Sequence, residues 1–519
     1  MKAKYLIISF LFLILFSIKG YGQKESNLIT LEDESMYSHI LKQEVKYSIC
    51  LPEDYHHSKG KYPVVYMLHG LGDNASSWLE YGRIDSFVKQ RVKSGHIIPM
   101  IYVMPEGYRT YYVNDYYGKF KYQDMFIKEL IPHIDKKYRT QADKAHRATI
   151  GYSMGGFGAL TLALNNQDVF GVTVPLSISI RTDEQYMTEE ASGWDDQWGR
   201  LFGGVGETGE KRLTDYYKKN NPFDMLKKGN PATRIYISNG DDEGTLARSN
   251  EELHMMMRDK NIPHEFRVRN GGHEFSYWFN ALFDGLNFIS DAFEGKEYRG
   301  DEQKELMFSD IVQLETIKYI NSEIQIYLPD DYSNGNRLYP VLYVDAKLKD
   351  SEMEKFAKFA DNMISTMEVA PMLIVFFDSD NLNVTIEEFT DYFESTYRIR
   401  KGWRFRGYLG YKKGGLVALQ QIQNKRFTCI AAFDASIPSE SQLLSDLDKL
   451  DKKSFENRWI FIDMPDKGTS YKANGKLHLL LKDKGVYHEY RVRQDTGDTN
   501  YLYQGIGEAM QFISDKIHK

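Results

Sequence analysis

Ser153 lies between glycines in residues 151–156 (GYSMGG), after an apolar run and before a stretch typical of a helix. On a tight strand-to-helix turn, side chains at Gly151 and Gly155 would collide with neighbouring backbone, and the strained turn holds the serine hydroxyl outward. A serine hydroxyl is a weak nucleophile until a base takes its proton. The pattern therefore predicts acyl transfer through Ser153, provided that a base and an acid accompany it.

Candidates for both groups follow in the chain. His273 lies on the loop of residues 270–274 (NGGHE), directly after an alternating strand at residues 265–269. An apolar strand at residues 234–238 leads into residues 239–244 (NGDDEG), which carry three carboxylates. The histidine would take the serine proton, and one of these acids would fix the imidazole tautomer and stabilise the imidazolium.

The negative oxygen of a tetrahedral intermediate also needs hydrogen-bond donors. Residues 62–68 (YPVVYML) predict a buried strand that runs into residues 69–73 (HGLGD). The backbone amides of Leu71, on that loop, and Met154, next to the serine, are predicted to form the oxyanion hole.

These motifs, in this order, resemble the esterase D family of α/β-hydrolases, which includes feruloyl and acetylxylan esterases and S-formylglutathione hydrolase. The resemblance covers about residues 40–295 and also rests on residues 51–55, 104–107, 129–132 and 275–278. It implies ester hydrolysis without a cofactor or metal, with Ser153 as nucleophile and His273 as base. The family usually places its acid three residues after a glycine, which selects Glu243, counted from Gly240, over Asp242.

Three aromatic side chains are candidates for substrate contact. Trp194 and Trp198 fall in residues 180–226, which we interpret as an insertion that caps the site, and Tyr152 adjoins the nucleophile. The alternative for all three is core packing. The other histidines show no spacing typical of metal ligands.

Residues beyond about 297 repeat the first motifs in order. Residues 328–332 repeat 51–55, and residues 339–344 repeat 62–67, both 277 positions later. Residues 410–415 (GYKKGG) repeat the serine motif 259 positions later, and residues 488–493 repeat 264–269 with an offset of 224. Ordered repetition with shrinking offsets predicts a duplicated fold.

The repeat lacks the candidate nucleophile and the candidate base of the first unit. Lys412 stands in the place of Ser153, and Gly497 stands in the place of His273. The offset of 224 pairs Lys467 with Glu243, and Asp466 with Asp242. We expect the second unit to be catalytically inactive and dispensable for the chemistry of small esters.

The fold class predicted is α/β, with two tandem α/β-hydrolase-type domains, each a mostly parallel sheet flanked by helices. The predicted boundaries are a signal peptide at residues 1–22, a catalytic domain at 23–296 and a degenerate domain at 297–519. The basic start and apolar run of the leader indicate export, to the periplasm or beyond the cell. The sequence leaves the oligomeric state open.

Charge and cysteine content limit the partners. Removal of the leader leaves 63 Lys and Arg against 73 Asp and Glu, a net charge of −10, which argues against nucleic-acid or anionic-membrane partners. No cysteine lies near the cleavage site, and no later run is apolar enough to span a membrane, so we expect no membrane anchor. Cys50 and Cys429 lie in separate apolar segments and are predicted to be unpaired core residues.

The predicted function is a secreted serine esterase that removes acetyl or feruloyl groups from plant polysaccharide through an acyl-enzyme. A siderophore-type esterase and a general short-chain carboxylesterase are the competing enzymes. A non-catalytic carbohydrate-binding protein is the alternative outside catalysis.

Overall fold

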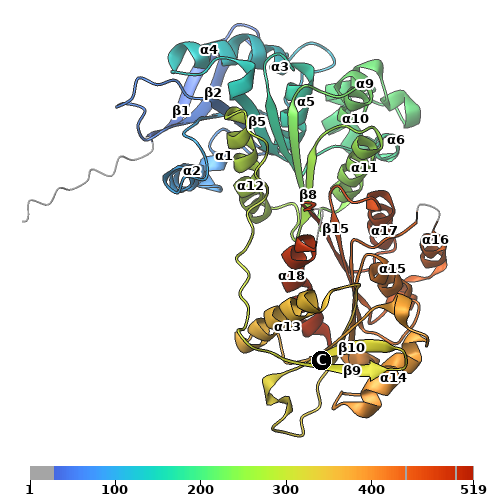
Figure 1. Ribbon diagram of the computed structural model, residues 1–519. Helices are drawn as coiled ribbons and strands as arrows, with labels where there is room; N and C mark the ends of the chain where they lie inside the picture. Colours follow the sequence, from blue (N-terminus) through green and yellow to red (C-terminus); the bar gives the residue numbers. More distant parts are fainter. Residues whose placement is uncertain (1–28, 439–440, 497–498, 518–519) are drawn as a thin grey trace, which may run out of the picture.

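The computed structural model describes residues 29–438, 441–496 and 499–517, so the predicted leader at residues 1–22 lies outside the described residues. These residues build one mixed sheet of 16 strands with helices on both faces (Figure 1). The first eight strands are β1 (Ile29–Ser38), β2 (Gln43–Leu51), β3 (Val64–Leu68), β4 (Ile101–Pro105), β5 (Arg147–Tyr152), β6 (Val172–Leu176), β7 (Arg234–Gly240) and β8 (Glu265–Arg269). The other eight are β9 (Gln313–Tyr319), β10 (Ser322–Leu328), β11 (Val341–Asp345), β12 (Leu373–Phe377), β13 (Arg406–Tyr411), β14 (Cys429–Phe433), β15 (Trp459–Pro465) and β16 (His488–Arg493).

The strand order is the same in the N-terminal half (residues 29–296) and the C-terminal half (residues 297–517). From its outer edge, the first half runs β1-β2-β4-β3-β5-β6-β7-β8, and the second runs β9-β10-β12-β11-β13-β14-β15-β16. In each half the two outermost strands are antiparallel and the other six are parallel. The halves join edge to edge, where Val268 of β8 pairs antiparallel with Val492 of β16.

Helices cover both faces of the sheet because its central strands are buried on both sides. The helices of the N-terminal half are α1 (Ser77–Glu80), α2 (Ile84–Lys93), α3 (Tyr122–Met125), α4 (Ile131–Lys137), α5 (Met154–Asn165), α6 (Asp183–Thr188), α7 (Ala191–Gly193), α8 (Arg200–Phe202), α9 (Asp215–Asn220), α10 (Pro222–Lys227), α11 (Thr245–Asp259) and α12 (Phe275–Phe293). Those of the C-terminal half are α13 (Asp350–Ser365), α14 (Ile386–Thr396), α15 (Lys413–Gln420), α16 (Gln442–Lys449), α17 (Tyr471–Asp483) and α18 (Asn500–Ile517). One hydrophobic core runs under α5 and α11 into the C-terminal half, while α2 with α12 and α13 with α18 cover separate cores.

The predicted α/β fold is confirmed. The carboxyl ends of parallel strands meet at one edge of a sheet, so the loops after β3, β5, β7 and β8 converge there. Cys50 and Cys429 are both buried and unpaired, as the sequence predicted. Within residues 29–438, 441–496 and 499–517, no helix combines the length and apolarity that crossing a membrane requires.

Candidate active site

Ser153 occupies a strained turn between β5 and α5. Its backbone lies at φ 56° and ψ −117°, a conformation that residues other than glycine rarely adopt. A Cβ on Gly151 would stand 2.4 Å from the carbonyl oxygen of Gly155, and one on Gly155 would stand 2.1 Å from that of Leu68. Only glycine fits at these two positions. The two glycines therefore permit the tight turn that raises the serine above the sheet edge.

Three side chains from three loops form a hydrogen-bonded chain. Nε2 of His273 lies 2.9 Å from Oγ of Ser153, and Nδ1 of His273 lies 2.6 Å from Oε2 of Glu243. The Glu243 side chain is fully buried, whereas that of His273 is 37% exposed. The carboxylate is thus shielded from water while the imidazole is partly open to solvent, an arrangement that can move a proton from the serine.

Further groups hold the Glu243 carboxylate. Ser177, directly after β6, donates its hydroxyl to Oε1, and the indole Nε1 of Trp278 donates to the Ser177 oxygen at 2.8 Å. The amide of Gly240 lies 3.4 Å from the same Oε1. A buried carboxyl group is costly unless hydrogen bonds compensate it, and these donors satisfy the Glu243 oxygen that does not contact the imidazole.

The structure separates the two carboxylates that the sequence left in competition. Asp242 is exposed and takes part through its backbone, with its amide donating to the Gly271 carbonyl at 3.0 Å. Glu243 turns inward and meets His273. The geometry therefore brings Glu243, and not Asp242, to the histidine.

The predicted oxyanion loop lies against the serine turn. β3 and β5 are parallel neighbours with Leu68 opposite Gly151, so Leu71 and Met154 both follow the carboxyl ends of adjacent strands. Met154 is the first residue of α5, and the amides of a first helical turn have no partner within the helix. Both residues therefore follow strand ends at the same edge of the sheet as the serine, and the oxyanion hole stays a prediction for their amides.

A buried histidine fixes the shape of that loop. The amide of Gly107 donates to Nε2 of His69 at 2.8 Å, so Nδ1 carries the proton that it donates to the Gly70 carbonyl, also at 2.8 Å. The hydroxyl of Tyr112 donates to the His69 carbonyl at 3.0 Å. Sequence reasoning singled out neither the histidine nor Gly107 as supports, because their partners come from a distant loop.

Tyr152 is fully buried. Its ring stacks on Trp278 with the ring centroids 4.2 Å apart, and its hydroxyl donates to Asp73 at 2.6 Å. Burial and the neighbouring Asp73 raise the pKa of Tyr152. The residue therefore ties the oxyanion loop to the start of α12 and presents no surface to a ligand.

The predicted insertion forms several short helices, α6 to α10, between β6 and β7. Trp194 and Trp198 are 0% and 2% exposed and pack inside it, with the Trp198 ring 4.5 Å from that of Tyr111. The Tyr111 hydroxyl lies 3.3 Å from Oγ of Ser179, whose amide donates to the Ser153 carbonyl. Both tryptophans are buried and offer almost no surface to a ligand, which fits the packing alternative.

The C-terminal half keeps the serine turn without the serine. Lys412 has φ 54° and ψ −109°, and a Cβ on Gly414 would stand 2.0 Å from the Asp345 carbonyl oxygen. Asp434 stands where Ser177 does, and burial raises its pKa to about 6. Position 497, paired with His273, lies outside the described residues. The C-terminal half therefore keeps the backbone conformation of the serine turn, with a lysine in place of the nucleophile.

The structure corrects one pairing of the two halves. The offset of 224 matched Asp466 with Asp242, but β7 and β15 end at Gly240 and Pro465, which is an offset of 225. Asp466 therefore corresponds to Asp241, and the sequence from Asp466 to Asn474 of α17 is one residue shorter than that from Asp241 to Asn250 of α11. The offset of 224 failed because this deletion lies inside a loop.

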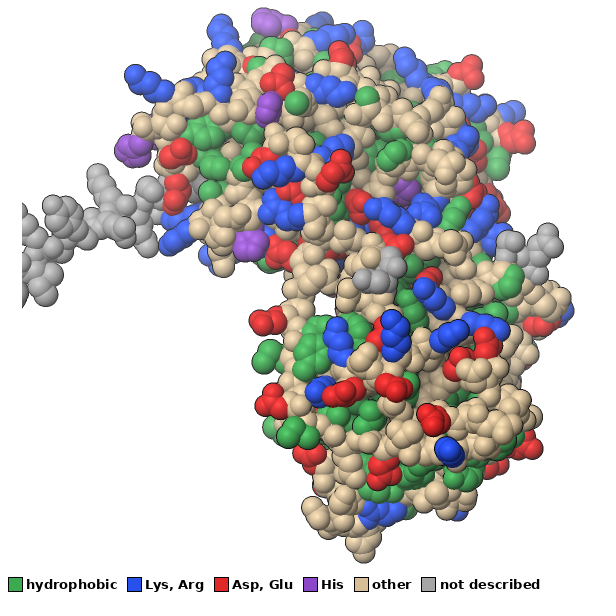
Figure 2. Space-filling view, in the orientation of Figure 1, with side chains coloured by type: hydrophobic (Ala, Val, Ile, Leu, Met, Phe, Trp, Pro, Cys, Tyr) green, Lys and Arg blue, Asp and Glu red, His purple; other side chains and the backbone are tan. Residues whose placement is uncertain are grey.

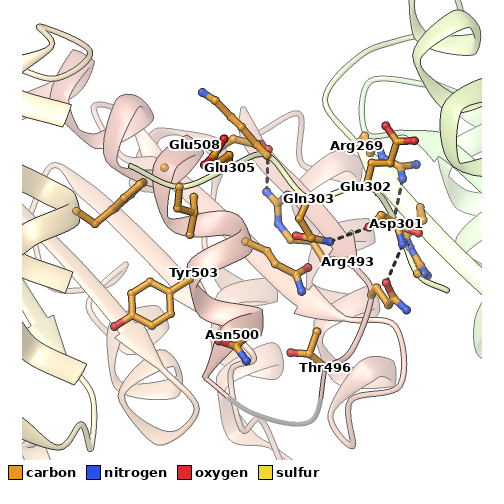
Figure 3. A pocket seen from close by; sticks show the side chains of 18 of the residues that line it. Arg269, Asp301, Glu302, Gln303, Glu305, Arg493, Thr496, Asn500, Tyr503 and Glu508 are labelled. Atoms are coloured by element: carbon orange, nitrogen blue, oxygen red, sulfur yellow. Dashed lines mark hydrogen bonds and ion pairs between the residues drawn. The ribbon is translucent and has the colours of Figure 1, made fainter. Parts of the chain in front are cut away.

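Within the described ranges no cluster of His, Cys, Asp or Glu is suited to a metal ion. A cavity of about 820 Å³ lies between the two halves and is lined by none of the three side chains of the hydrogen-bonded chain (Figure 3). Several of its charged groups form ion pairs with one another, as in the contact of Arg493 with Glu508 at 3.0 Å.

The fold and this edge of the sheet define an α/β-hydrolase-type architecture with a serine, histidine and carboxylate in hydrogen-bonding order. A family model described as "Putative esterase" matches residues 38–289. That segment, slightly less than half of the chain, is similar to this esterase family.

Named relatives agree with the match. The chain is 39% identical over 119 residues to an "Endo-1,4-beta-xylanase/feruloyl esterase" of Xylanibacter ruminicola, which covers 22% of this chain and 16% of the relative. It is 27% identical over 257 residues to an esterase of Mycobacterium tuberculosis, which covers 46% and 55%. It thus spans about half or less of the length of these two relatives. A solved "ferulic acid esterase" aligns with a TM-score of 0.43 and 28% identity, over 51% of this chain and 99% of that one.

Proposed function

We propose that the protein is a serine hydrolase of carboxylic esters, with Ser153 as nucleophile, His273 as base and Glu243 as acid. The observation that carries this proposal is the hydrogen-bonded chain from Ser153 through His273 to the buried Glu243, at 2.9 and 2.6 Å. The match of residues 38–289 to a family model described as "Putative esterase" supports it independently.

The geometry gives a two-step reaction. Nε2 of His273 takes the hydroxyl proton as Oγ of Ser153 bonds to the ester carbonyl carbon, and the carbonyl electron pair moves onto oxygen, where the amides of Leu71 and Met154 bind it. The intermediate collapses, the imidazolium gives its proton to the departing alcohol, and an acyl-serine remains. Water then repeats the sequence and releases the acid and the serine.

We further propose that the substrate is an acetyl or feruloyl ester on plant polysaccharide and that the protein is exported. The similarity to a relative named as a feruloyl esterase supports the acyl group, and the basic and apolar leader at residues 1–22 supports export. Export is tested by N-terminal sequencing of the secreted protein, which should begin at Gln23.

The catalytic proposal is tested with a fluorophosphonate and an ester panel. The wild type should form an adduct at Ser153, and Ser153→Ala should form none. Glu243→Gln should lose most turnover, while Asp242→Asn, the matched control on the adjacent exposed residue, should keep it. The reverse pattern would reassign the acid, and a folded wild type without an adduct would favour a carbohydrate-binding protein.

The panel compares methyl ferulate, acetylated xylan, p-nitrophenyl acetate and a catecholate triester. Preference for the first two supports the polysaccharide substrate. Preference for the triester or for the small acetate alone would point to a siderophore-type or a general carboxylesterase.

A further inference from the structure

The two halves meet through an interface with twofold pseudo-symmetry. Nη1 of Arg491, on β16, lies 2.5 Å from Oδ2 of Asp241, and Nη1 of Arg267, on β8, lies 2.6 Å from Oδ2 of Asp466. Figure 1 shows β8 and β15 at the centre of this junction, and in Figure 2 acidic and basic side chains gather around the same narrow waist. An arginine of each half therefore binds an aspartate on the loop that follows β7 or β15 of the other half. We call each of these two arginine–aspartate pairs a clamp.

The linker between the halves secures one side of this junction. Oδ2 of Asp301 accepts hydrogen bonds from Arg267 at 2.6 Å and from Arg269 at 3.1 Å, while its amide donates to Gln494 of the C-terminal half at 2.9 Å (Figure 3). Arg267 is thus held by several acids, so it stays paired if Asp466 is neutralised.

One clamp acts on the loops of the active site. Asp241 begins the acid loop (residues 241–244), which carries Glu243, and its Oδ1 accepts the amide of Gly271 at 3.1 Å. Gly271 belongs to the histidine loop (residues 270–274), which carries His273. This buried carboxylate, together with the bond from the Asp242 amide to the Gly271 carbonyl at 3.0 Å, therefore links the two loops that must bring acid and base together.

Groups of the C-terminal half surround that carboxylate. Besides Arg491, the amide of Tyr490 donates to Oδ2 of Asp241 at 3.2 Å, and Nζ of Lys482, on α17, donates to its backbone carbonyl at 2.6 Å. Asp241 and Arg491 are each 4% exposed. Burial raises the pKa of Asp241, and the charge of Arg491 acts in the opposite direction. Without Arg491, the N-terminal half alone would stabilise the Asp241 carboxylate poorly.

The mirror clamp acts on loops without a triad. Oδ1 of Asp466 accepts the amide of Asp495 at 3.0 Å, as Asp241 accepts that of Gly271, and Arg258 donates to the Asp466 carbonyl at 3.0 Å, as Lys482 does to that of Asp241. The molecule thus contains its own control, because the side without the nucleophile has a corresponding buried ion pair and corresponding contacts to a loop amide and a backbone carbonyl.

We propose that Arg491 and Lys482 are positioning residues for the hydrolytic site, because they fix Asp241 and, through it, the register of the acid and histidine loops. The proposal rests on the proposed function of Ser153, His273 and Glu243. The inactive half is then required for efficient chemistry even on small esters, in contrast to the expectation from sequence that it is dispensable.

The test compares mirror-related variants of the full-length protein, Asp241→Asn with Asp466→Asn and Lys482→Met with Arg258→Met. Each is assayed for kcat and KM on p-nitrophenyl acetate, for the rate of fluorophosphonate labelling and for thermal unfolding. Hydrogen exchange is measured on peptides spanning residues 240–245 and 270–276.

Both aspartate variants should lose similar stability, but only Asp241→Asn should lower kcat, by about 10- to 100-fold, since small misplacements of reacting groups cost this much. KM should change little, exchange should rise in the two peptides, and Arg491→Lys should retain more kcat than Arg491→Met. Equal loss of kcat in the two aspartate variants, or wild-type kcat in Asp241→Asn, would overturn the proposal.

If Asp241→Asn does not fold, the milder pair decides, and equal kcat for Lys482→Met and Arg258→Met would count against the proposal. An inert wild type would instead refute the proposed function. In that case, unchanged exchange of both peptides in the folded Lys482→Met variant would also refute the clamp itself.

Discussion

Ser177→Ala should impair catalysis although it replaces no residue of the triad. The change removes the hydroxyl that donates to Oε1 of the buried Glu243 and that accepts the Trp278 indole N–H at 2.8 Å. A hydrogen bond to a charged group contributes about 1.5–3 kcal/mol. If this loss is expressed in the transition state, where the imidazolium depends on the carboxylate, kcat/KM falls about 10- to 100-fold.

Stability should fall as well, because the indole N–H of Trp278 is left buried without its acceptor, at a cost of about 1–3 kcal/mol. The assay is hydrolysis of p-nitrophenyl acetate with thermal unfolding measured in parallel. Ser238→Ala is the matched control, since that buried serine bonds Tyr277 at 2.8 Å and makes no bond to the triad. A Ser177→Ala enzyme with kcat/KM within about twofold of wild type would refute the view that this hydroxyl orients Glu243.

Two further changes test the fold, and a third tests whether the repeated turn can react. Glu251 is fully buried, and burial raises its pKa from 4.5 to about 8, so the folded protein keeps a proton that the unfolded chain releases. The free energy of unfolding should therefore fall as pH rises between these values, and denaturant titrations of Glu251→Gln should show a flatter profile; an unchanged slope would contradict this. Gly155→Ala should destabilise the fold by about 3 kcal/mol, because its Cβ would stand 2.1 Å from the Leu68 carbonyl oxygen, and an unshifted thermal midpoint would argue against the close packing of the elbow. Lys412→Ser in a Ser153→Ala background should gain no fluorophosphonate adduct, since the second elbow lacks a histidine partner; an adduct there would show that the repeat is still competent.

Local patterns in the sequence predicted the elements and most of the candidate site. Gly151 and Gly155 around Ser153 require a strand-to-helix turn for steric reasons that act within a few residues. Alternating and apolar runs located the strands that deliver His273 and Glu243, because side-chain periodicity reflects which faces are buried.

Tertiary structure decided what depends on contacts between distant segments. The family spacing favoured Glu243 over Asp242, but the contact that holds the Glu243 carboxylate comes from Ser177, a lone serine after β6 that carries no sequence signal. The burial of Trp198 likewise depends on partners from another loop.

The relation between the two halves was also beyond the sequence. Repeated motifs showed that the fold is duplicated, but a motif does not indicate which edges of two sheets will pair. Only the three-dimensional arrangement, with β8 beside β16, brings Arg491 to Asp241, two residues from Glu243. The sequence determined the chemistry available to each half, and the packing of one half on the other decided which groups hold that chemistry in place, because burial and ion pairing act through space and not along the chain.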